Sequence, residues 1–375
     1  MSKLPNTGTS IFTVMSALAA EHGALNLSQG FPNFPIDPRL RDALQRAAAG
    51  DTHQYLPMPG HRGLREKIAA LIARSYQRML DPDREVLITA GATQGLFSAI
   101  QALTVPGDDV VMLDPCYDSY DPSVLMAGAR PVHVPLDDQF LPDWDRIADT
   151  LTERTRLLVI NNPHNPSGRV WRTSDFEHLA ALLARHPRLL LLSDEVYEFI
   201  TFDQPHRSAH QHPALRDRSI VVSSFGKTFH ITGWKIGYVT GPAALVAEIR
   251  KVHQFVVFCV NSVAQAALHE YLDLVDVNAL GAFYRDKRDA FRALLAGSRF
   301  DLLPSEGSYF QVARYGAISD EPDTDFCRRL ILEHGVATIP LSVFHADGRD
   351  DRMIRFCFAK DTDTLTRAAE RLCAI

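Results

Sequence analysis

The sequence has no long apolar stretch: no run of apolar residues approaches the roughly 20 that a helix needs to cross a bilayer. Its start, Met-Ser-Lys-Leu-Pro-Asn-Thr-Gly, is also poor in apolar side chains, so we expect no signal peptide there. Neither sign of charge dominates, since 39 basic and 45 acidic residues give a formal net charge of −6. This balance favours neither nucleic acid nor an anionic membrane surface as a partner.

Cysteine is scarce and widely spaced. The chain has five cysteines, an odd number, and no Cys-x-x-Cys pair. This spacing supports neither a zinc site nor a disulfide framework, and we expect no metal. A reducing, cytoplasmic compartment is the expected location. The five residues are Cys116, Cys259, Cys327, Cys357 and Cys373.

The chain has 375 residues, which suits two domains, or one large domain with a smaller one. From residue 86 onward, short apolar runs alternate with helix-like stretches such as 94–102 and 174–184. This alternation predicts an α/β fold with a mostly parallel sheet and helices on both faces. The predicted strands are Val86–Thr89, Asp109–Leu113, Arg130–Val134, Thr155–Ile160, Leu189–Ser193, Ser219–Ser223 and Gly237–Thr240.

Lys227 follows one of these predicted strands, where the chain turns to small residues. In an open α/β sheet, ligands bind outside the carboxyl ends of the strands. A lone lysine is more often a solvated surface residue. Here Ser224 precedes it by three residues, Lys235 follows by eight, and the glycines between them allow close approach of backbone to a ligand. These neighbours favour a binding site.

The pattern Ser-x-x-Lys227 followed by Thr-Gly-Trp-Lys235-x-Gly resembles the cofactor-binding lysine segment of aminotransferases that use pyridoxal phosphate (PLP) and share the aspartate aminotransferase fold. The Gly-Trp-Lys form is similar to the methionine, kynurenine and glutamine aminotransferases, whereas aspartate aminotransferases usually carry Arg at the position of Lys235. The resemblance covers nearly the whole chain. It implies PLP as cofactor, an amino acid and a 2-oxo acid as substrates, and a homodimer with shared active sites.

The resemblance also implies how the chain is divided. Residues 46–282 form a large PLP-binding domain, and residues 283–375 form a small α+β domain. Residues 1–45 are an N-terminal arm and part of the small domain, because chains of this family start and end there. A long helical pattern from about 261 to 295 joins the two domains.

A phosphate site is expected at residues 89–94, which follow a predicted strand and open a predicted helix. Small residues expose backbone N–H groups, and a helix N-terminus favours an anion. The turn alone is a weak signal, because a strand-to-helix turn needs a glycine anyway. It is not Gly-x-Gly-x-x-Gly, so a dinucleotide site gains no support. The resemblance assigns Ala92, Thr93, Ser224 and Lys235 to the phosphate.

Aromatic and acidic residues at other strand ends are candidates to hold the cofactor ring. An aromatic face can stack on a pyridine ring, and the resemblance favours Tyr117 over Tyr120, although a core tyrosine is the alternative. A carboxylate would keep the ring nitrogen protonated. The resemblance favours Asp194 over Glu195, and a helix-capping acid is the alternative. Tyr197 could donate its hydroxyl to the ring oxygen.

An asparagine-rich segment, 159–168, follows another predicted strand and contains two Asn-Pro turns that restrict the backbone. Asn165 matches the family residue that donates to the ring oxygen and also borders the substrate. The Asn162–Pro163 and Asn165–Pro166 bonds are candidates for the cis form.

Lys227 is the expected catalytic residue. A free lysine has a pKa near 10.4 and is almost entirely charged at neutral pH. Burial and a nearby cation lower this pKa, which frees the amine to attack a carbonyl. By the resemblance, Lys227 holds PLP, is displaced by the amino acid, and then moves a proton at the substrate α-carbon.

Arg355 lies among apolar residues in a predicted strand, with no acidic residue close in sequence. Its guanidinium matches a carboxylate in a bidentate way, and an interdomain salt bridge is the alternative. The resemblance places the backbone of Gly30 against the substrate too, and Tyr55 against the cofactor phosphate of the neighbouring subunit. We find no second arginine for a dicarboxylic donor, and expect aromatic residues near the site: Phe31, Phe34, Tyr55, Tyr117 and Phe344.

These residues predict transamination of uncharged donors such as methionine, aromatic amino acids, kynurenine or glutamine. A PLP-dependent lyase that acts on carbon–sulfur bonds of cysteine conjugates or cystathionine is an alternative on the same fold. A transcription regulator that uses the fold as an effector sensor ranks last, because we see no spare N-terminal segment large enough for a DNA-binding domain and the net charge is negative.

Overall fold

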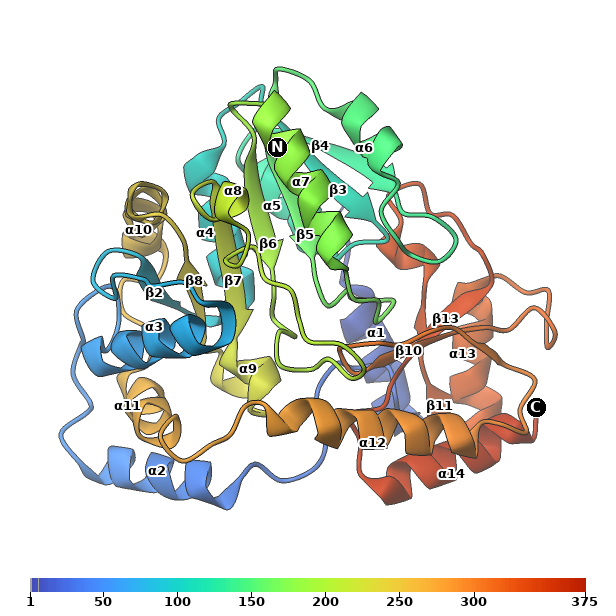
Figure 1. Ribbon diagram of the computed structural model, residues 1–375. Helices are drawn as coiled ribbons and strands as arrows, with labels where there is room; N and C mark the ends of the chain where they lie inside the picture. The colour runs from blue at the N-terminus through green and yellow to red at the C-terminus, as the bar shows by residue number, and fades with distance from the viewer. Residues whose placement is uncertain (1, 6) are drawn as a thin grey trace.

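The computed structural model describes residues 2–5 and 7–375. A seven-stranded sheet forms the centre of the larger part of the molecule (Figure 1). Its order is β2-β8-β7-β6-β5-β3-β4, and only β8 runs antiparallel to its neighbours. The predicted mostly parallel sheet is therefore confirmed. The strands are β2 (Val86–Thr89), β3 (Asp109–Asp114), β4 (Arg130–Pro135), β5 (Thr155–Asn161), β6 (Leu190–Asp194), β7 (Ser219–Ser224) and β8 (Gly237–Thr240).

Helices cover both faces of this sheet because successive strand residues point to opposite sides. On one face, Val159 and Leu192 pack with α4 (Gly91–Leu103), α5 (Tyr120–Met126) and α10 (Ala243–Val256). On the other face, Leu158 and Leu191 pack with α7 (Thr173–Arg185). Both faces are apolar, which is why the strands read as continuous apolar runs in the sequence. The shorter helices near this sheet are α6 (Trp144–Thr150), α8 (Pro213–Arg216) and α9 (Phe225–Thr228).

A second, antiparallel sheet of order β12-β13-β10-β9 forms the smaller part of the molecule. Its core is continuous with one face of the large sheet. A two-stranded parallel pair, β1 (Leu25–Asn26) with β11 (Val336–Ala337), ties the N-terminal segment to this part. The remaining elements here are β9 (Asp301–Leu302), β10 (Phe310–Arg314), β12 (Ile339–Pro340), β13 (Met353–Cys357), α13 (Asp323–His334) and α14 (Thr362–Cys373).

The domain boundaries at 45/46 and 282/283 stay predictions. Both fall inside helices, α2 (Pro38–Ala49) and α12 (Ala279–Leu294). In Figure 1, α12 runs along the lower edge of the molecule from the large part toward the small one. The helix α3 (Arg62–Tyr76) and its neighbours form a third apolar cluster against β2.

Two expectations about helices were wrong in detail. The long helical pattern over 261–295 is two helices, α11 (Ser262–Tyr271) and α12, separated by residues 272–278. Asp276 lies in this break and accepts a hydrogen bond from the Asn278 N–H, and such local side-chain bonds compete with helix. The predicted N-terminal arm also contains a helix that was not expected, α1 (Ile11–Glu21), which begins after the cap residue Ser10. Residues 1 and 6 of this arm lie outside the described residues.

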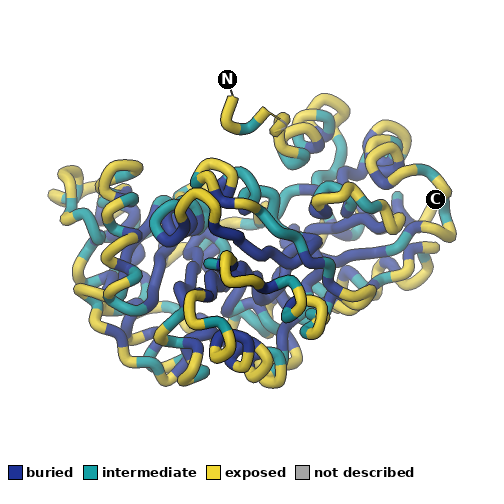
Figure 2. The backbone as a smooth tube through the Cα atoms, turned by 90° about the horizontal axis from the view of Figure 1, so that it is seen from above, coloured by how far each residue is buried: buried dark blue, intermediate teal, exposed yellow. Residues whose placement is uncertain are grey.

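Buried backbone runs through the centre of the molecule, and exposed segments surround it (Figure 2). Within the described residues, no helix is both long and apolar enough to span a bilayer. All five cysteines are free.

Candidate active site

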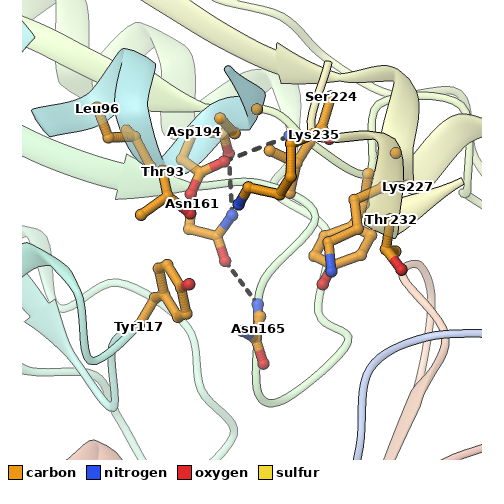
Figure 3. A pocket seen from close by; sticks show the side chains of 15 residues that line it. Thr93, Leu96, Tyr117, Asn161, Asn165, Asp194, Ser224, Lys227, Thr232 and Lys235 are labelled. Atoms are coloured by element: carbon orange, nitrogen blue, oxygen red, sulfur yellow. Dashed lines mark hydrogen bonds between the residues drawn. The ribbon is translucent and has the colours of Figure 1, made fainter. Parts of the chain in front are cut away.

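A cavity of about 180 Å³ opens at the carboxyl ends of the central parallel strands (Figure 3). Nine of the residues predicted for the site line it, and they come from the ends of β6 and β7 and from the loops and helices that follow the strands. These nine are Ala92, Thr93, Tyr117, Asn165, Asp194, Tyr197, Ser224, Lys227 and Lys235. The sequence separates them by up to 143 positions, and the parallel sheet brings them to one edge.

One end of the cavity suits an anion. The helix α4 begins here, and its cap residue Ala90 offers no side-chain hydrogen bond to the first N–H groups. Ser224 and Lys235 line the same end. Gly237 keeps the strand β8 close to this turn, since a Cβ there would meet the Ala92 nitrogen at 2.9 Å. Uncapped N–H groups, a hydroxyl and an ammonium together make a set of donors that suits a phosphate.

Asp194 lies at the end of β6 and is 4% exposed. Its Oδ2 accepts from the Tyr120 hydroxyl at 2.7 Å, and its Oδ1 accepts from the Val196 N–H at 3.4 Å. Burial raises the pKa of Asp194 to about 6, although these hydrogen bonds act in the opposite direction. Both partners within the described chain are neutral donors. A buried carboxylate of this kind fits a cationic ring nitrogen.

Glu195 has different surroundings and does not line the cavity. It accepts hydrogen bonds from the Ser193 hydroxyl at 2.7 Å and the Ala209 N–H at 3.0 Å, and it pairs with His206 at 2.7 Å. The two adjacent acids thus point to opposite environments, as their consecutive positions at the end of a strand require.

Lys227 reaches the cavity from the short helix α9. Its Nζ donates to the Gly30 carbonyl at 3.2 Å and lies 5.9 Å from the ring centres of Tyr197 and Tyr309. Burial lowers the pKa of Lys227 to about 8. At pH 7 about a tenth of the amine is therefore uncharged and able to attack a carbonyl or accept a proton, far more than for a free lysine.

Arg355 does not line the cavity wall itself, but a short chain of hydrogen bonds connects it there. Its Nη1 donates to Asn165 Oδ1 at 2.7 Å, and the Asn165 N–H donates to Asn161 Oδ1 at 2.6 Å. Arg355 is 1% exposed and its guanidinium lies 3.9 Å from the Phe310 ring centre. Burial lowers its pKa to about 10, and its Nε has no hydrogen-bond partner within the described chain. This donor set is suited to a carboxylate.

Of the three tyrosines that remain, Tyr117 lines the cavity, whereas Tyr120 and Tyr55 lie outside it. In Figure 3, Tyr117 stands across the cavity from Lys227, whereas Tyr120 lies outside the cavity and bonds to Asp194. Tyr55 is 83% exposed and packs against Phe258, in a separate surface hollow. Both Asn-Pro bonds that were candidates for the cis form are cis.

The aromatic residues expected near the site are not all gathered there. Phe344 lies 5.3 Å from the Arg355 guanidinium, as does Phe12 of α1, which the sequence analysis did not single out. Phe34 instead packs against His230 and Phe283. The predicted gathering of aromatic residues is therefore wrong for Phe34, and the rings around Arg355 are those of Phe12, Phe310 and Phe344.

Two functional neighbours were missed from the sequence. Asn161 donates to the Asp194 carbonyl at 2.9 Å and so fixes the ends of two strands, and Tyr120 bonds to the Asp194 carboxylate. A signal for Asn161 did exist: it ends β5 directly beside Asp194 at the end of β6. Tyr120 carried no such signal, because its position depends on how the loop after β3 folds back.

The ligand atoms of Asp114, Cys116 and His133 lie within 4.8 Å of one another behind this loop. Both ring nitrogens of His133 are already engaged, with Asp114 at 2.7 Å and Asp121 at 2.9 Å. The group is thus a hydrogen-bonded cluster that links β3, β4 and α5.

The cavity would accommodate a phosphorylated aromatic aldehyde: the donors at the start of α4 would suit its phosphate, and Tyr117, Asp194 and Lys227 would suit its ring, its ring nitrogen and its aldehyde. Such a cofactor, once bound, withdraws electrons from the α-carbon of an attached amino acid. The fold and the cavity together define an enzyme of the aspartate aminotransferase fold.

Comparisons with known proteins agree. A family model for class I and II aminotransferases matches residues 23–372. The chain is 49% identical to methionine aminotransferase of Escherichia coli, covering 99% of this chain and 97% of that protein. It is 34% identical to kynurenine–oxoglutarate transaminase 1 of Homo sapiens, covering 95% of this chain and 93% of that protein.

Solved structures give the same result. The structure that identified a methionine aminotransferase function in Escherichia coli matches with a TM-score of 0.97 at 48% identity, covering 100% of this chain and 99% of that one. N-succinyldiaminopimelate aminotransferase of Mycobacterium tuberculosis matches with a TM-score of 0.96 at 40% identity, covering 100% of this chain and 99% of that one. The chain belongs to the class I and II aminotransferases. It is a PLP-dependent transaminase that acts on an amino acid and a 2-oxo acid.

Proposed function

We propose that this transaminase uses Lys227 as its catalytic residue and prefers uncharged amino donors. The observation that carries the proposal is the pair formed across one cavity by the amine of Lys227 and the buried carboxylate of Asp194. In this proposal Lys227 holds the cofactor aldehyde, and Asp194 keeps the ring nitrogen protonated. Tyr197 and Asn165 serve the ring oxygen, Tyr117 stacks on the ring, and the phosphate lies against Ala92, Thr93, Ser224 and Lys235.

Arg355 binds the α-carboxylate of the donor, and Lys227 takes a proton from its α-carbon. A buried guanidinium with an unpaired N–H and aromatic rings around it favours one carboxylate held beside an apolar group. A dicarboxylic donor would bring a second carboxylate into this apolar setting, and an unpaired buried carboxylate is costly. Two relatives are named for methionine and kynurenine, which supports uncharged donors, whereas a third is named for N-succinyldiaminopimelate. Donors are expected to include methionine, aromatic amino acids, kynurenine and glutamine.

The test is kcat/KM for a panel of donors with one fixed 2-oxo acid: methionine, phenylalanine, kynurenine, glutamine, aspartate and N-succinyldiaminopimelate. We expect methionine to exceed aspartate at least tenfold, and breadth among apolar donors, because apolar fit discriminates by only about 1–3 kcal/mol per methylene. Aspartate or N-succinyldiaminopimelate ranking first would contradict the proposed preference. Release of pyruvate from a cysteine conjugate without any 2-oxo acid would instead favour the lyase alternative.

Two variants sharpen this experiment. Arg355→Gln should lower kcat/KM for every donor by a similar factor, since all donors share the α-carboxylate. Arg314→Gln is the matched control, because Arg314 lies on the neighbouring strand β10 and pairs with Asp301 at 3.4 Å near the surface. A loss in Arg355→Gln that is confined to aspartate would reassign Arg355 to side-chain recognition.

We propose further that the enzyme is a homodimer whose active sites are completed by both subunits. Lys235 is exposed, and an apolar surface groove with Phe97, Met126 and Val256 begins beside it. Phe255, Phe258 and Tyr55 add exposed apolar area, with Phe255 85% exposed and Tyr55 83% exposed. Surfaces of this kind mark interfaces. In the dimer, Tyr55 of each chain reaches the cofactor phosphate of the other.

A cytoplasmic location is the remaining part of the proposal. It is supported by five free thiols, one of them the exposed Cys373, since disulfides are rare in reducing compartments. Cell fractionation should find the transaminase activity together with a cytoplasmic marker enzyme, and activity in an extracytoplasmic fraction would contradict this location.

A further inference from the structure

Four consecutive backbone carbonyls border the active site, from Ser28 to Phe31, and each accepts a hydrogen bond from a cationic side chain. The Ser28 carbonyl accepts from Arg355 Nη2 at 3.0 Å, and the Gly30 carbonyl accepts from Lys227 Nζ at 3.2 Å. The carbonyls of Gln29 and Phe31 accept from a third cation, Lys360, at 3.4 and 2.7 Å. We call residues 28–31 the substrate loop.

Lys360 is unusual for a lysine because it is 2% exposed. Within the described chain its ammonium bonds to carbonyls and to no carboxylate, and it lies 4.4 Å from the ring centre of Phe31. A buried ammonium with no hydrogen-bonded carboxylate costs free energy, which the hydrogen bonds, the aromatic face and the charge of nearby Asp361 offset in part. Burial also lowers the pKa of Lys360. If packing were the only role of the side chain at position 360, an apolar residue would fill the space at a lower free-energy cost than a buried ammonium.

The substrate loop is held tightly on its inner side as well. The Gly30 carbonyl also accepts from the Tyr309 hydroxyl at 2.7 Å. A Cβ at Gly30 would meet the Phe310 ring at 2.9 Å, and the same ring stacks on Arg355. Gly30 is thus packed between the two residues proposed to hold the cofactor and the donor carboxylate. A rotation of the Gly30 peptide would disturb the partners of both.

We propose that Lys360 is a positioning residue for substrate binding. It holds the carbonyls on either side of Gly30, and so fixes the Gly30 peptide next to Lys227 and keeps the Ser28 carbonyl as a hydrogen-bond acceptor for Arg355. It also fixes the Phe31 ring, which is 40% exposed, at the rim of the site. Because Arg355, the proposed carboxylate site, is hydrogen-bonded to this loop and both substrates carry an α-carboxylate, Lys360 acts on the amino acid and the 2-oxo acid alike. The inference rests on the proposed roles of Lys227 and Arg355.

The primary test is Lys360→Met, which keeps the length of the side chain and removes its donors. We expect the KM values of the donor and of the 2-oxo acid to rise tenfold or more, with kcat changed less than threefold. A purely structural role would lower the unfolding midpoint or the yield of active enzyme and leave both KM values unchanged. Unchanged KM values would overturn the inference.

Lys360→Arg keeps the charge and the donors, and we expect it to restore both KM values to within threefold of the parent. Lys360→Gln keeps one donor group and should give KM values between those of the parent and the Met variant, so it serves if Lys360→Met folds poorly. Lys251→Met is the matched control, since Lys251 is a surface residue paired with Glu248. Parental KM values in Lys360→Gln, or a tenfold rise in Lys251→Met, would each count against the inference.

Hydrogen exchange gives a readout that does not depend on activity. Amides of residues 28–34 should exchange faster in Lys360→Met than in the parent or in Lys251→Met, with exchange in the central sheet unchanged. Equal exchange at 28–34 in all three proteins would overturn the inference. If the parent enzyme transfers no amino group from any donor, the proposed function fails; if the parent is active and the Lys360 variants keep its KM values, only the positioning role fails.

Discussion

Asp194 and Glu195 are neighbours in the chain, but their environments differ enough to predict opposite mutant phenotypes. Asp194→Asn should leave the unfolding midpoint nearly unchanged and lower kcat by two orders of magnitude or more, because the cofactor nitrogen loses its anionic partner. Glu195→Gln should keep most of kcat per folded molecule and lose stability instead, since Glu195 is completely buried and paired with His206.

Steady-state kinetics and chemical denaturation of the two variants make this comparison. Near-normal turnover in Asp194→Asn, together with an inactive but stable Glu195→Gln, would transfer the proposed role to Glu195. Such a result would mean that the surroundings of the two carboxylates change when the cofactor binds.

At the level of single residues, the sequence indicated most of the residues that line the cavity, because the ends of the strands converge in a parallel sheet. Small and hydroxyl residues after a strand pointed to a binding site at Lys227, whereas only the family resemblance favoured Asp194 over Glu195. The partners that orient them were harder to predict. Tyr120 comes from a folded-back loop, and Lys360 reads in the sequence as an ordinary lysine between a strand and a helix. Their roles depend on tertiary contacts that periodicity does not encode.

Among the secondary-structure elements, the strands β3 and β4 and the helix α5 are joined by His133, which lies between Asp114 and Asp121. Burial opposes a charged ring, but the hydrogen bonds to the two carboxylates prevail and raise the pKa of His133 to about 10, from an ordinary value of 6.5. The folded chain therefore keeps a proton that the unfolded chain loses above pH 6.5. The contribution of His133 to stability is complete below pH 6.5 and is lost as the pH rises through about 10.

We predict that His133→Gln lowers the free energy of unfolding by about 1–3 kcal/mol at pH 6, and that this difference shrinks toward pH 10. Urea denaturation of both proteins at pH 6, 8 and 10 measures it. Asp121→Asn is the companion variant and should show part of the same loss with the same trend. A difference that grows between pH 6 and pH 10 would contradict the assigned proton.

The regular elements were predicted better than their interruptions. Every strand of the large sheet was predicted within one residue at each end. For most strands burial on both faces leaves little ambiguity, whereas the edge strand β4 is only partly buried. The break between α11 and α12 and the start of α1 were missed. Both depend on local capping by polar side chains, Asp276 and Ser10, within segments whose apolar spacing looks helical.

For the whole molecule, the proposed dimer makes a prediction that two defective variants can test together. Lys227→Ala lacks the lysine, and Tyr55→Ala lacks the side chain that we assign to the partner's site. In a mixed dimer one site carries both substitutions, and the other site is intact. Dissociation and reassociation of the two variants should therefore restore activity, up to about a quarter of the parental value for random pairing.

Sedimentation velocity of the parent enzyme provides the control for this experiment. A fully active monomer would contradict shared active sites. Mixed dimers that form but stay inactive would remove Tyr55 from the proposed interface.

The most direct test of the account is the chemical identity of the residue that holds the cofactor. The purified enzyme, incubated with PLP and reduced with borohydride, should carry one phosphopyridoxyl group per chain, and peptide mass spectrometry should place it on Lys227. Lys227→Ala should carry none at that position. A group found on another lysine, such as Lys235, or an unlabelled but active enzyme, would contradict the account.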